Sequence, residues 1–279
     1  MIIGLDLGGT KIAGGIVRNG KVVDFAQRAT EANKGKARVI ANIRAVIDDL
    51  SKGRKIAGVG IGVPGTFKGT RVTCLTNIRA LDGIDLKRAL EITCPVALEN
   101  DARCFTLAEH RYGAIRGART AVGVVVGTGL GTGIIIDGRL YRGAGSAGEL
   151  SRVVGNPLTG MHTWEHFMGG THIVERHHRR GGKEDSCQEI WESRSRIARV
   201  TREETVCHFA MHMANLVRIY DPAVIVFGGG VSRPDLVREA RKRLPLYIMG
   251  VDHCPRAVMG RLKHAGVIGA ALASGAKRS

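Results

Sequence analysis

Short apolar runs alternate along the chain with stretches in which apolar positions recur every three or four residues. The short runs are rich in valine and isoleucine and predict buried strands, whereas the spaced positions predict amphipathic helices. The predicted strands cover residues 2–7, 12–17, 56–63, 95–99, 124–126, 134–136 and 223–227. The predicted helices cover 34–51, 102–112, two segments between 188 and 220, and 266–274. Asn19-Gly20 is a type I′ turn signal, so the first strands are expected to form an antiparallel meander.

A glycine-rich stretch interrupts the apolar pattern between residues 126 and 134. It holds Gly127, Gly129, Gly131 and Gly133, which predicts a strand, a glycine hairpin and a second strand. Glycines leave room for backbone N–H groups to converge on an anion, and phosphate is the expected ligand. A hairpin that only reverses the chain is the alternative at this stage.

A second glycine turn, Gly8-Gly9-Thr10-Lys11, joins the first two predicted strands. Thr10 and Lys11 can donate to phosphate oxygens, and Asp6 can hold Mg²⁺ through water. Two glycine hairpins about 120 residues apart, each able to bind phosphate, suggest a duplicated domain with a nucleotide between the halves.

Length and composition add limits to this picture. A chain of 279 residues is expected to form about two domains. No apolar run reaches the roughly 18 residues of a membrane span and no signal peptide is evident, so we expect a cytoplasmic protein without a membrane partner. The six cysteines are scattered without a C-x-x-C pair, which predicts reduced thiols that mostly fill the core.

The net charge of +17 would attract polyanions, including nucleotides, polyphosphate and nucleic acid. The one local concentration, residues 176–183, is expected to be a solvated loop. Only 4% of residues are aromatic, so stacking platforms are scarce and no specific nucleic-acid partner is expected.

Two segments carry a specific resemblance. Asp6-x-Gly8-Gly9-Thr10-Lys11 and Gly127-Thr128-Gly129-x-Gly131 resemble the phosphate motifs of the sugar kinase, Hsp70 and actin superfamily. The whole chain is most similar to the ROK (repressor, open reading frame, kinase) sugar kinases, which include glucokinases, fructokinases and N-acetylhexosamine kinases.

The resemblance implies a fold, a domain division and a nucleotide site. The fold would be α/β, with two ribonuclease-H-like (actin-like ATPase) domains and a nucleotide and sugar cleft between them. The first domain would span residues 1–108, and a C-terminal helix at about 266–279 would return to it. The second domain would span residues 109–265. The protein would be a homodimer. The implied contacts to ATP come from Asp6, Gly8, Gly9, Thr10, Lys11, Gly127, Thr128, Gly129, Gly131, Gly228, Gly229 and Gly230.

The resemblance also implies a sugar site. Glu99-Asn100-Asp101-Ala102 is similar to the family segment in which the Asn binds sugar hydroxyls and the Asp is the catalytic base. Without the resemblance, Asn100 and Asp101 would be ordinary N-caps at a strand-to-helix junction. The remaining implied sugar contacts are Gly65, Asn77, Glu149 and Glu165. Without the resemblance, each would be interpreted as an ordinary loop residue.

The leading functional prediction is phosphorylation of the primary hydroxyl of a hexose or N-acetylhexosamine by ATP and Mg²⁺, with Asp101 as general base. The charge leaves polyphosphate open as the donor. A sugar-responsive regulator of the same family is the other alternative, but Asp6 leaves no room before it for a helix-turn-helix domain. His162-x-x-Glu165-His166 matches a metalloprotease pattern, yet turn residues precede it where a long helix is needed.

The chain departs from its family at the zinc site that many ROK kinases carry. Ser151-Arg152 stands in place of a Gly-His pair, and no cysteine occurs between Pro157 and Trp164. We therefore expect no structural zinc, and a sugar loop held by packing of Trp164 and Phe167. His208 and His212 lie four residues apart on a predicted helix and are expected to pack rather than to bind metal.

Overall fold

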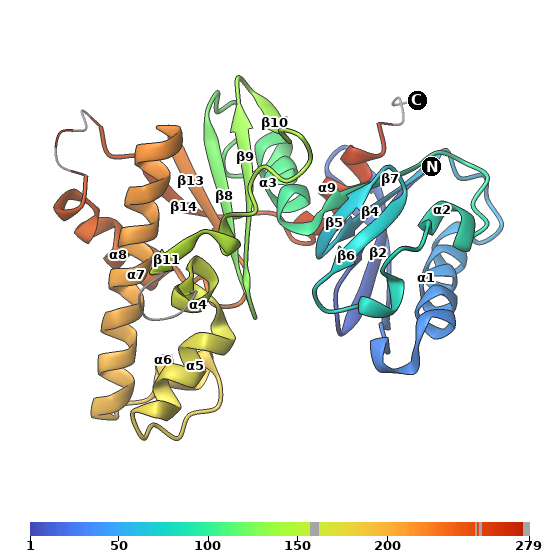
Figure 1. Cartoon of the computed structure of the whole chain (residues 1–279). Helices are drawn as coiled ribbons and strands as arrows, with labels where there is room; N and C mark the ends of the chain where they lie inside the picture. Colours follow the sequence, from blue (N-terminus) through green and yellow to red (C-terminus); the bar gives the residue numbers. More distant parts are fainter. Residues whose placement is uncertain (157–161, 249, 251–252, 276–279) are drawn as a thin grey trace. The chain divides into compact units, whose positions relative to one another are not determined.

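Two five-stranded sheets form the framework of the molecule (Figure 1). The computed structural model describes residues 1–156, 162–248, 250 and 253–275. Each sheet is the centre of one compact unit. Unit 1 contains Met1–Gly113, Arg142–Ser146 and the chain from Leu262 onward, and unit 2 contains Ala114–Tyr141 and Ala147–Arg261.

The sheet of unit 1 has the strand order β3-β2-β1-β4-β7. Its strands are β1 (Ile2–Leu7), β2 (Lys11–Arg18), β3 (Lys21–Ala29), β4 (Gly58–Val63) and β7 (Val96–Asn100). The first three strands are antiparallel, and β4 and β7 run parallel to β1. Asn19 and Gly20 have φ angles of 48° and 77°, as a type I′ turn requires, so the predicted meander is confirmed.

Helices cover this sheet and explain several of its glycines. They are α1 (Lys36–Ser51), α2 (Leu86–Ala89), α3 (Asp101–Tyr112) and α9 (Ala265–Ala273), and a small hairpin is formed by β5 (Gly65–Lys68) and β6 (Arg71–Leu75). The buried apolar face of α1 packs on the sheet in one hydrophobic core. The backbone of α9 lies so close to β1 and β4 that a Cβ on Gly4 or Gly60 would overlap its carbonyl oxygens.

Unit 2 repeats the plan of unit 1. Its sheet has the order β10-β9-β8-β13-β14, in which β8, β9 and β10 are antiparallel and β13 and β14 run parallel to β8. The strands are β8 (Ala121–Val126), β9 (Leu130–Ile136), β10 (Arg139–Tyr141), β13 (Val224–Gly228) and β14 (Arg256–Met259). The same sequence of antiparallel and parallel pairings in both units confirms the duplicated α/β fold.

The helices of unit 2 build the second hydrophobic core. They are α4 (Trp164–Met168), α5 (Gly170–Arg179), α6 (Cys187–Glu192), α7 (Arg196–Tyr220) and α8 (Pro234–Arg243), and a short β11 (Val154–Asn156) pairs with β12 (His162–Thr163). Figure 1 shows α7 as the long orange helix. Phe209 of α7 and Phe227 of β13 are both fully buried and stack with ring centroids 6.0 Å apart.

Single-turn 3-10 helices complete the list of elements. They span Ala32–Lys34, Arg79–Leu81, Leu150–Arg152 and Leu244–Leu246. None of the helices in the described ranges has an apolar stretch long enough to cross a membrane.

Two sequence-based expectations about elements were wrong in part. Gly131 and Gly133 lie within β9 opposite Val125 and Gly123, because the strand pairing continues through these glycines, so the turn holds only residues 127–129. Residues 176–179 of the basic cluster form the end of α5 rather than a solvated loop, because Arg176 pairs with Glu204 of α7. The prediction that most of the six cysteines fill the core is confirmed, because Cys104 is fully buried and Cys94, Cys187 and Cys254 pack partly buried against the two cores.

Candidate active site

The predicted catalytic residues of unit 1 gather at one edge of its sheet. Asp6 of β1 lies opposite Gly62 of β4, and Gly62 lies opposite Glu99 of β7. Asn100 and Asp101 follow directly, at the point where β7 ends and α3 begins. Because these three strands are parallel, their carboxyl ends meet at the same edge, which is where ligands bind in open α/β sheets.

Asp6 has an environment suited to a functional carboxylate. Burial raises the pKa of its carboxyl group, and the positive charge of Lys11 opposes this effect. A Cβ on Gly266, at the start of α9, would come within 2.5 Å of Asp6 Oδ2. The glycine therefore leaves the space that the carboxylate occupies.

The turn after β1 is held from both sides. Gly8 donates its backbone N–H to the Lys11 carbonyl at 2.9 Å, and the fully buried Thr30 donates its hydroxyl to the Gly8 carbonyl at 2.6 Å. A Cβ on Gly9 would lie 2.7 Å from Cβ of Asn77. The structure thus brings Asn77, a predicted sugar contact, against the predicted phosphate turn, where Thr10 and Lys11 are exposed.

Asn100 and Asp101 have different structural roles. Asn100 is the N-cap of α3, because its Oδ1 accepts from the backbone N–H groups of Ala102 at 3.0 Å and Arg103 at 3.2 Å. Asp101 is the first helical residue, and its Oδ1 accepts from Ala102 at 2.8 Å. The capping alternative therefore describes Asn100, while the partly buried Asp101 stands in the first turn.

Gly65 has a structural reason to be glycine. Its φ angle is 155°, and a Cβ there would overlap the carbonyl of Cys74 on the paired strand β6. The close approach of the two strands accounts for this residue, so its glycine identity carries no information about sugar binding.

In unit 2 the tight turn between β8 and β9 is anchored to the start of α5 and to α4. Gly170 and Thr171 donate backbone N–H groups to the carbonyls of Gly127 and Thr128, at 2.8 and 3.2 Å. The N–H of Leu130 donates to Glu165 Oε2 at 2.9 Å. A Cβ on Gly129 would overlap this carboxylate, so a larger residue there would displace the Glu165 side chain from Leu130. This contact, by which Glu165 braces the hairpin, was not apparent in the sequence.

The loop after β13 closes over the end of β8. Gly229 has a φ angle of 88°, and a Cβ there would overlap the Val126 carbonyl. Val231 donates its N–H to that same carbonyl at 3.0 Å, and Ser232 donates its hydroxyl to the carbonyl of Gly228 at 2.7 Å. The two predicted nucleotide loops of unit 2 are therefore in direct contact.

Both loops line one cavity of about 660 Å³. Its walls also include residues from α5, from α6 and from the segment between these two helices. The described lining is Gly127, Thr128, Gly170, Thr171, Val174, Glu175, His178, Asp185, Ser186, Cys187, Gln188, Gly230 and Val231. A Cβ added to Gly127 or Gly230 would have no atom within 4 Å, so the fold itself does not require glycine at either position. A ligand in the cavity would explain both glycines.

Glu149 precedes the 3-10 turn Leu150–Arg152 and is partly buried. It follows Gly148, whose φ angle is 91° and whose carbonyl accepts a hydrogen bond from the buried Thr132 hydroxyl. The segment in front of Glu149 is therefore fixed to β9.

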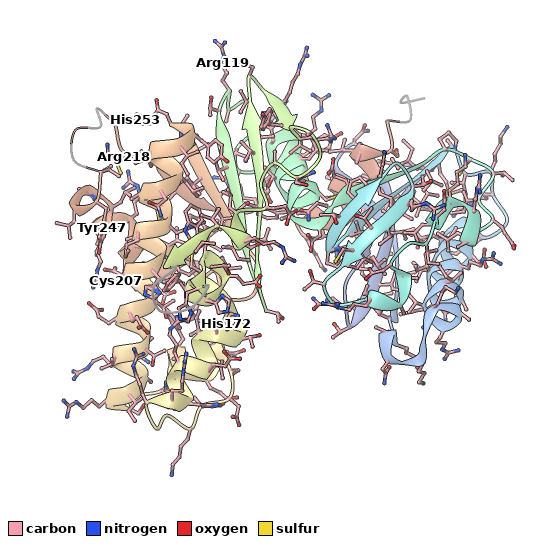
Figure 2. All side chains as sticks on the ribbon, viewed as in Figure 1. Arg119, His172, Cys207, Arg218, Tyr247 and His253 are labelled. Atoms are coloured by element: carbon pink, nitrogen blue, oxygen red, sulfur yellow. The ribbon has the colours of Figure 1, made fainter. Side chains whose placement is uncertain are left out.

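A histidine group occupies the region of the family zinc site. His166 stacks on His172 of α5, labelled in Figure 2, with ring centroids 4.3 Å apart, and lies edge-on to His162 at 5.5 Å. Burial lowers the pKa of His166, as do the neighbouring His172 and His162. Within the described residues, no three metal-binding side chains are placed to hold one ion. Part of the predicted loop, 157–161, lies outside those residues, so the absence of zinc stays a prediction.

Trp164 and Phe167 of α4 pack on α7. Trp164 lies edge-on to His212 at 4.6 Å and Phe167 lies edge-on to His208 at 5.0 Å. His208 Nδ1 is 3.2 Å from the Phe167 carbonyl oxygen. The two helix histidines thus pack against aromatic rings, as expected.

Sequence reasoning missed the surroundings of these residues. It did not identify Glu175, Asp185 or Gln188 as cavity-lining residues, because they lie in a region without a local motif. It also missed Arg103 and Arg142, which contact Glu99 beside the candidate base. Another cavity of about 730 Å³, on unit 1, is lined by none of the predicted site residues.

Comparison with known proteins agrees with this geometry. A family model described as the ROK family matches residues 2–275. The N-acetyl-D-glucosamine kinase of Vibrio cholerae is 28% identical over 98% of this chain and 99% of its own length. The glucokinase of Thermotoga maritima is 29% identical over 97% and 96%.

Solved structures give the same answer. A ROK hexokinase from Thermus thermophilus has a TM-score of 0.84 at 28% identity, covering 98% of this chain and 97% of that one. A ROK family glucokinase from Streptomyces griseus, in complex with glucose and AMPPNP, has a TM-score of 0.82 at 28% identity, covering 98% of both chains. The chain spans nearly the full length of these proteins, shares their fold of two sheets, and belongs to the ROK family.

Proposed function

We propose that this protein is an ATP-dependent sugar kinase that phosphorylates the primary hydroxyl of a hexose or N-acetylhexosamine. The observation that carries the proposal is the strand register of unit 1, which aligns Asp6 with the start of α3 at the carboxyl edge of the sheet. Kinase relatives of nearly the same length support it, and one of their structures contains a sugar and a nucleotide.

Asp101 is the proposed general base. Phosphoryl transfer requires positioning and charge stabilisation, together with a group that accepts the proton of the attacking hydroxyl. Asp101 offers a partly buried carboxylate at the first residue of α3. Asn100, Asn77, Glu149 and Glu165 are the proposed polar contacts to the sugar hydroxyls.

The nucleotide is proposed to occupy the cavity of unit 2, with its phosphates toward Gly127 and Thr128. Asp6 fits a Mg²⁺ ion held through water, because Mg²⁺ prefers oxygen ligands and usually retains several waters. When bound, the ion would neutralise phosphate charge. Lys11, exposed at the turn of unit 1, is the proposed cationic contact to the transferred phosphate.

ATP is the proposed donor rather than polyphosphate. The described wall of the cavity contains the carboxylates of Glu175 and Asp185 and no lysine or arginine. Carboxylates repel a long polyanion, whereas they accept hydrogen bonds from the hydroxyls of a ribose. The net charge of +17 is therefore not concentrated where a polyphosphate chain would have to lie.

A coupled assay with a panel of hexoses and N-acetylhexosamines tests the proposal. We expect turnover with Mg-ATP on at least one sugar, and little or none with polyphosphate at any salt concentration. The absence of turnover on every sugar with both donors would refute the kinase assignment. Faster turnover with polyphosphate, lost on adding salt, would refute only the choice of donor.

A homodimer is proposed as the working state. Val200, Met211 and Ile219 are 44%, 49% and 56% exposed and fall within about 100° of one another around α7. Sedimentation should show a dimer that Met211→Lys dissociates, whereas Val23→Lys, at a similarly exposed position on β3, should leave it intact. A monomeric wild-type protein at micromolar concentration would contradict this.

A further inference from the structure

A buried carboxylate lies directly before the candidate catalytic pair. Glu99 is 1% exposed and lies in strand β7, immediately before Asn100 and Asp101. Its Oε1 accepts from the backbone N–H of Asn100 at 3.0 Å. The carboxylate therefore fixes the peptide through which β7 enters α3.

Two arginines hold this carboxylate. Arg103, 2% exposed, brings Nη1 to 3.5 Å from Glu99 Oε1, and Arg142 donates from Nε to Glu99 Oε2 at 2.6 Å. Arg103 also donates from Nη2 to the carbonyl of Gly145 at 2.8 Å. Burying these charges is costly unless each is paired and hydrogen-bonded, and here the geometry supplies both.

The arginine contacts reach a second part of the chain. Residues 142–146 belong to unit 1 although the chain on both sides of them belongs to unit 2. Gly145 donates its N–H to the Arg142 carbonyl at 2.9 Å, so the segment forms a turn. Glu99 binds the side chain of Arg142 at the start of this turn, and Arg103 binds the carbonyl of Gly145 near its end. Glu149, a proposed sugar contact, follows this turn by a few residues.

We propose that Glu99, Arg103 and Arg142 form a positioning network for the sugar site. The network ties the backbone of Asn100 and the turn at residues 142–146 to one buried carboxylate. It sets the start of α3, and so the place of Asp101, together with the segment that leads to Glu149. The inference rests on the proposed kinase function, and none of the three residues need touch the sugar.

Substitution of both partners tests the network. The variants are Glu99→Gln, Arg142→Met and the double variant, and the control is Arg28→Met. Arg28 forms a 2.8 Å ion pair with Asp49, and its side chain is 45% exposed against 50% for Arg142. If Glu99→Gln does not fold, Arg142→Met still tests the network, because a substitution at the half-exposed Arg142 should leave the protein folded.

We expect kcat/KM for the sugar to fall about 10- to 100-fold in both single variants, while the Kd for ATP changes by about twofold or less. The double variant should lose no more than the worse single variant, since both act through the same carboxylate. Lower Tm values with kcat/KM within about twofold of Arg28→Met would show a purely structural ion cluster and overturn the proposal.

Hydrogen exchange separates this inference from the proposed function. In Arg142→Met, amides of residues 142–149 should exchange at least about tenfold faster than in Arg28→Met, a readout that needs no turnover. Unchanged exchange in this segment would overturn the network even in an active kinase. If the wild-type protein has no kinase activity while exchange is still faster in Arg142→Met, only the proposed function is refuted and the network stands.

Discussion

At the residue scale, Asn100 and Asp101 separate two tasks that neighbouring polar residues often share. Asn100 accepts two backbone hydrogen bonds and caps α3, whereas Asp101 is placed one residue further into the helix. Loss of the cap and loss of the base should therefore be distinguishable by measurement.

Asp101→Asn should lower kcat by about 10²–10⁴ while ATP binding stays nearly intact, as expected for loss of a positioned base. Asn100→Ala should cost about 0.5–2 kcal/mol of unfolding free energy through the lost cap, in addition to losing its proposed contact with the sugar. Steady-state kinetics and urea unfolding on both variants make the comparison. An Asp101→Asn enzyme with near-normal kcat would show that another group accepts the proton.

Two glycines of the β8–β9 turn should respond differently to the same substitution. Gly127→Val places its side chain in the open cavity, so the protein should stay folded and lose ATP affinity about tenfold or more. Gly129→Val meets the Glu165 carboxylate and should lower both stability and ATP affinity. Calorimetric titration with ATP and thermal unfolding test this, and equal stability losses would contradict it.

At the element scale, α7 carries a buried imidazole that links stability to pH. His212 is 4% exposed, neither ring nitrogen has a hydrogen-bond partner, and burial lowers its pKa to about 3. The unfolded chain takes up a proton near pH 6.5, whereas the folded chain stays neutral. The contribution of neutral His212 to the free energy of unfolding is therefore fully present above about pH 6.5, and it is lost as the pH decreases toward 3.

Removing this imidazole should flatten the pH profile. Between pH 7.5 and 5.0, the free energy of unfolding of the wild-type protein should fall by about 2 kcal/mol more than that of His212→Leu. This figure follows from about 1.36 kcal/mol for each pH unit below 6.5. Urea unfolding at the two pH values gives the difference. His253→Leu, at a 44% exposed side chain, should keep the wild-type profile. A parallel loss in His212→Leu would mean that other groups control acid sensitivity.

The elements themselves were largely predictable from sequence. Strands and helices with a clear period, such as β1, α1 and β13, match the pattern, because burial on one face or on both imposes that period. Gly131 was misplaced because glycine is compatible with both a turn and a strand. The basic end of α5 was misread because its ion pair with Glu204 is made by a residue distant in sequence.

The candidate site was only partly predictable for the same reason. Asp6, Asn100 and Asp101 carry recognisable local motifs, and the strand register places them at one edge. The contact between Glu165 and Leu130 spans 35 residues, and that between Arg142 and Glu99 spans 43. No local pattern encodes such pairs, because they depend on how the elements pack.

At the scale of the whole molecule, unit 1 depends on a helix that follows unit 2 in the chain. Deleting residues 262–279 removes α9 and should unfold unit 1, while unit 2 keeps its own core. Hydrogen exchange should show β1 and β4 unprotected and β8 and β13 protected. Gly60→Val, whose side chain would overlap the Ala270 carbonyl, should reproduce the loss in unit 1. Protection of β1 in the truncated chain would contradict this.

The position of α9 also fixes an order of events during synthesis on the ribosome. The strand β1 is made early, but the helix that covers its Gly4 emerges only after all of unit 2 has been translated. Unit 2 has every residue it needs before that moment. The candidate catalytic edge of unit 1, with Asp6 beside Gly266, is therefore completed last, so a partly synthesised chain cannot position that carboxylate.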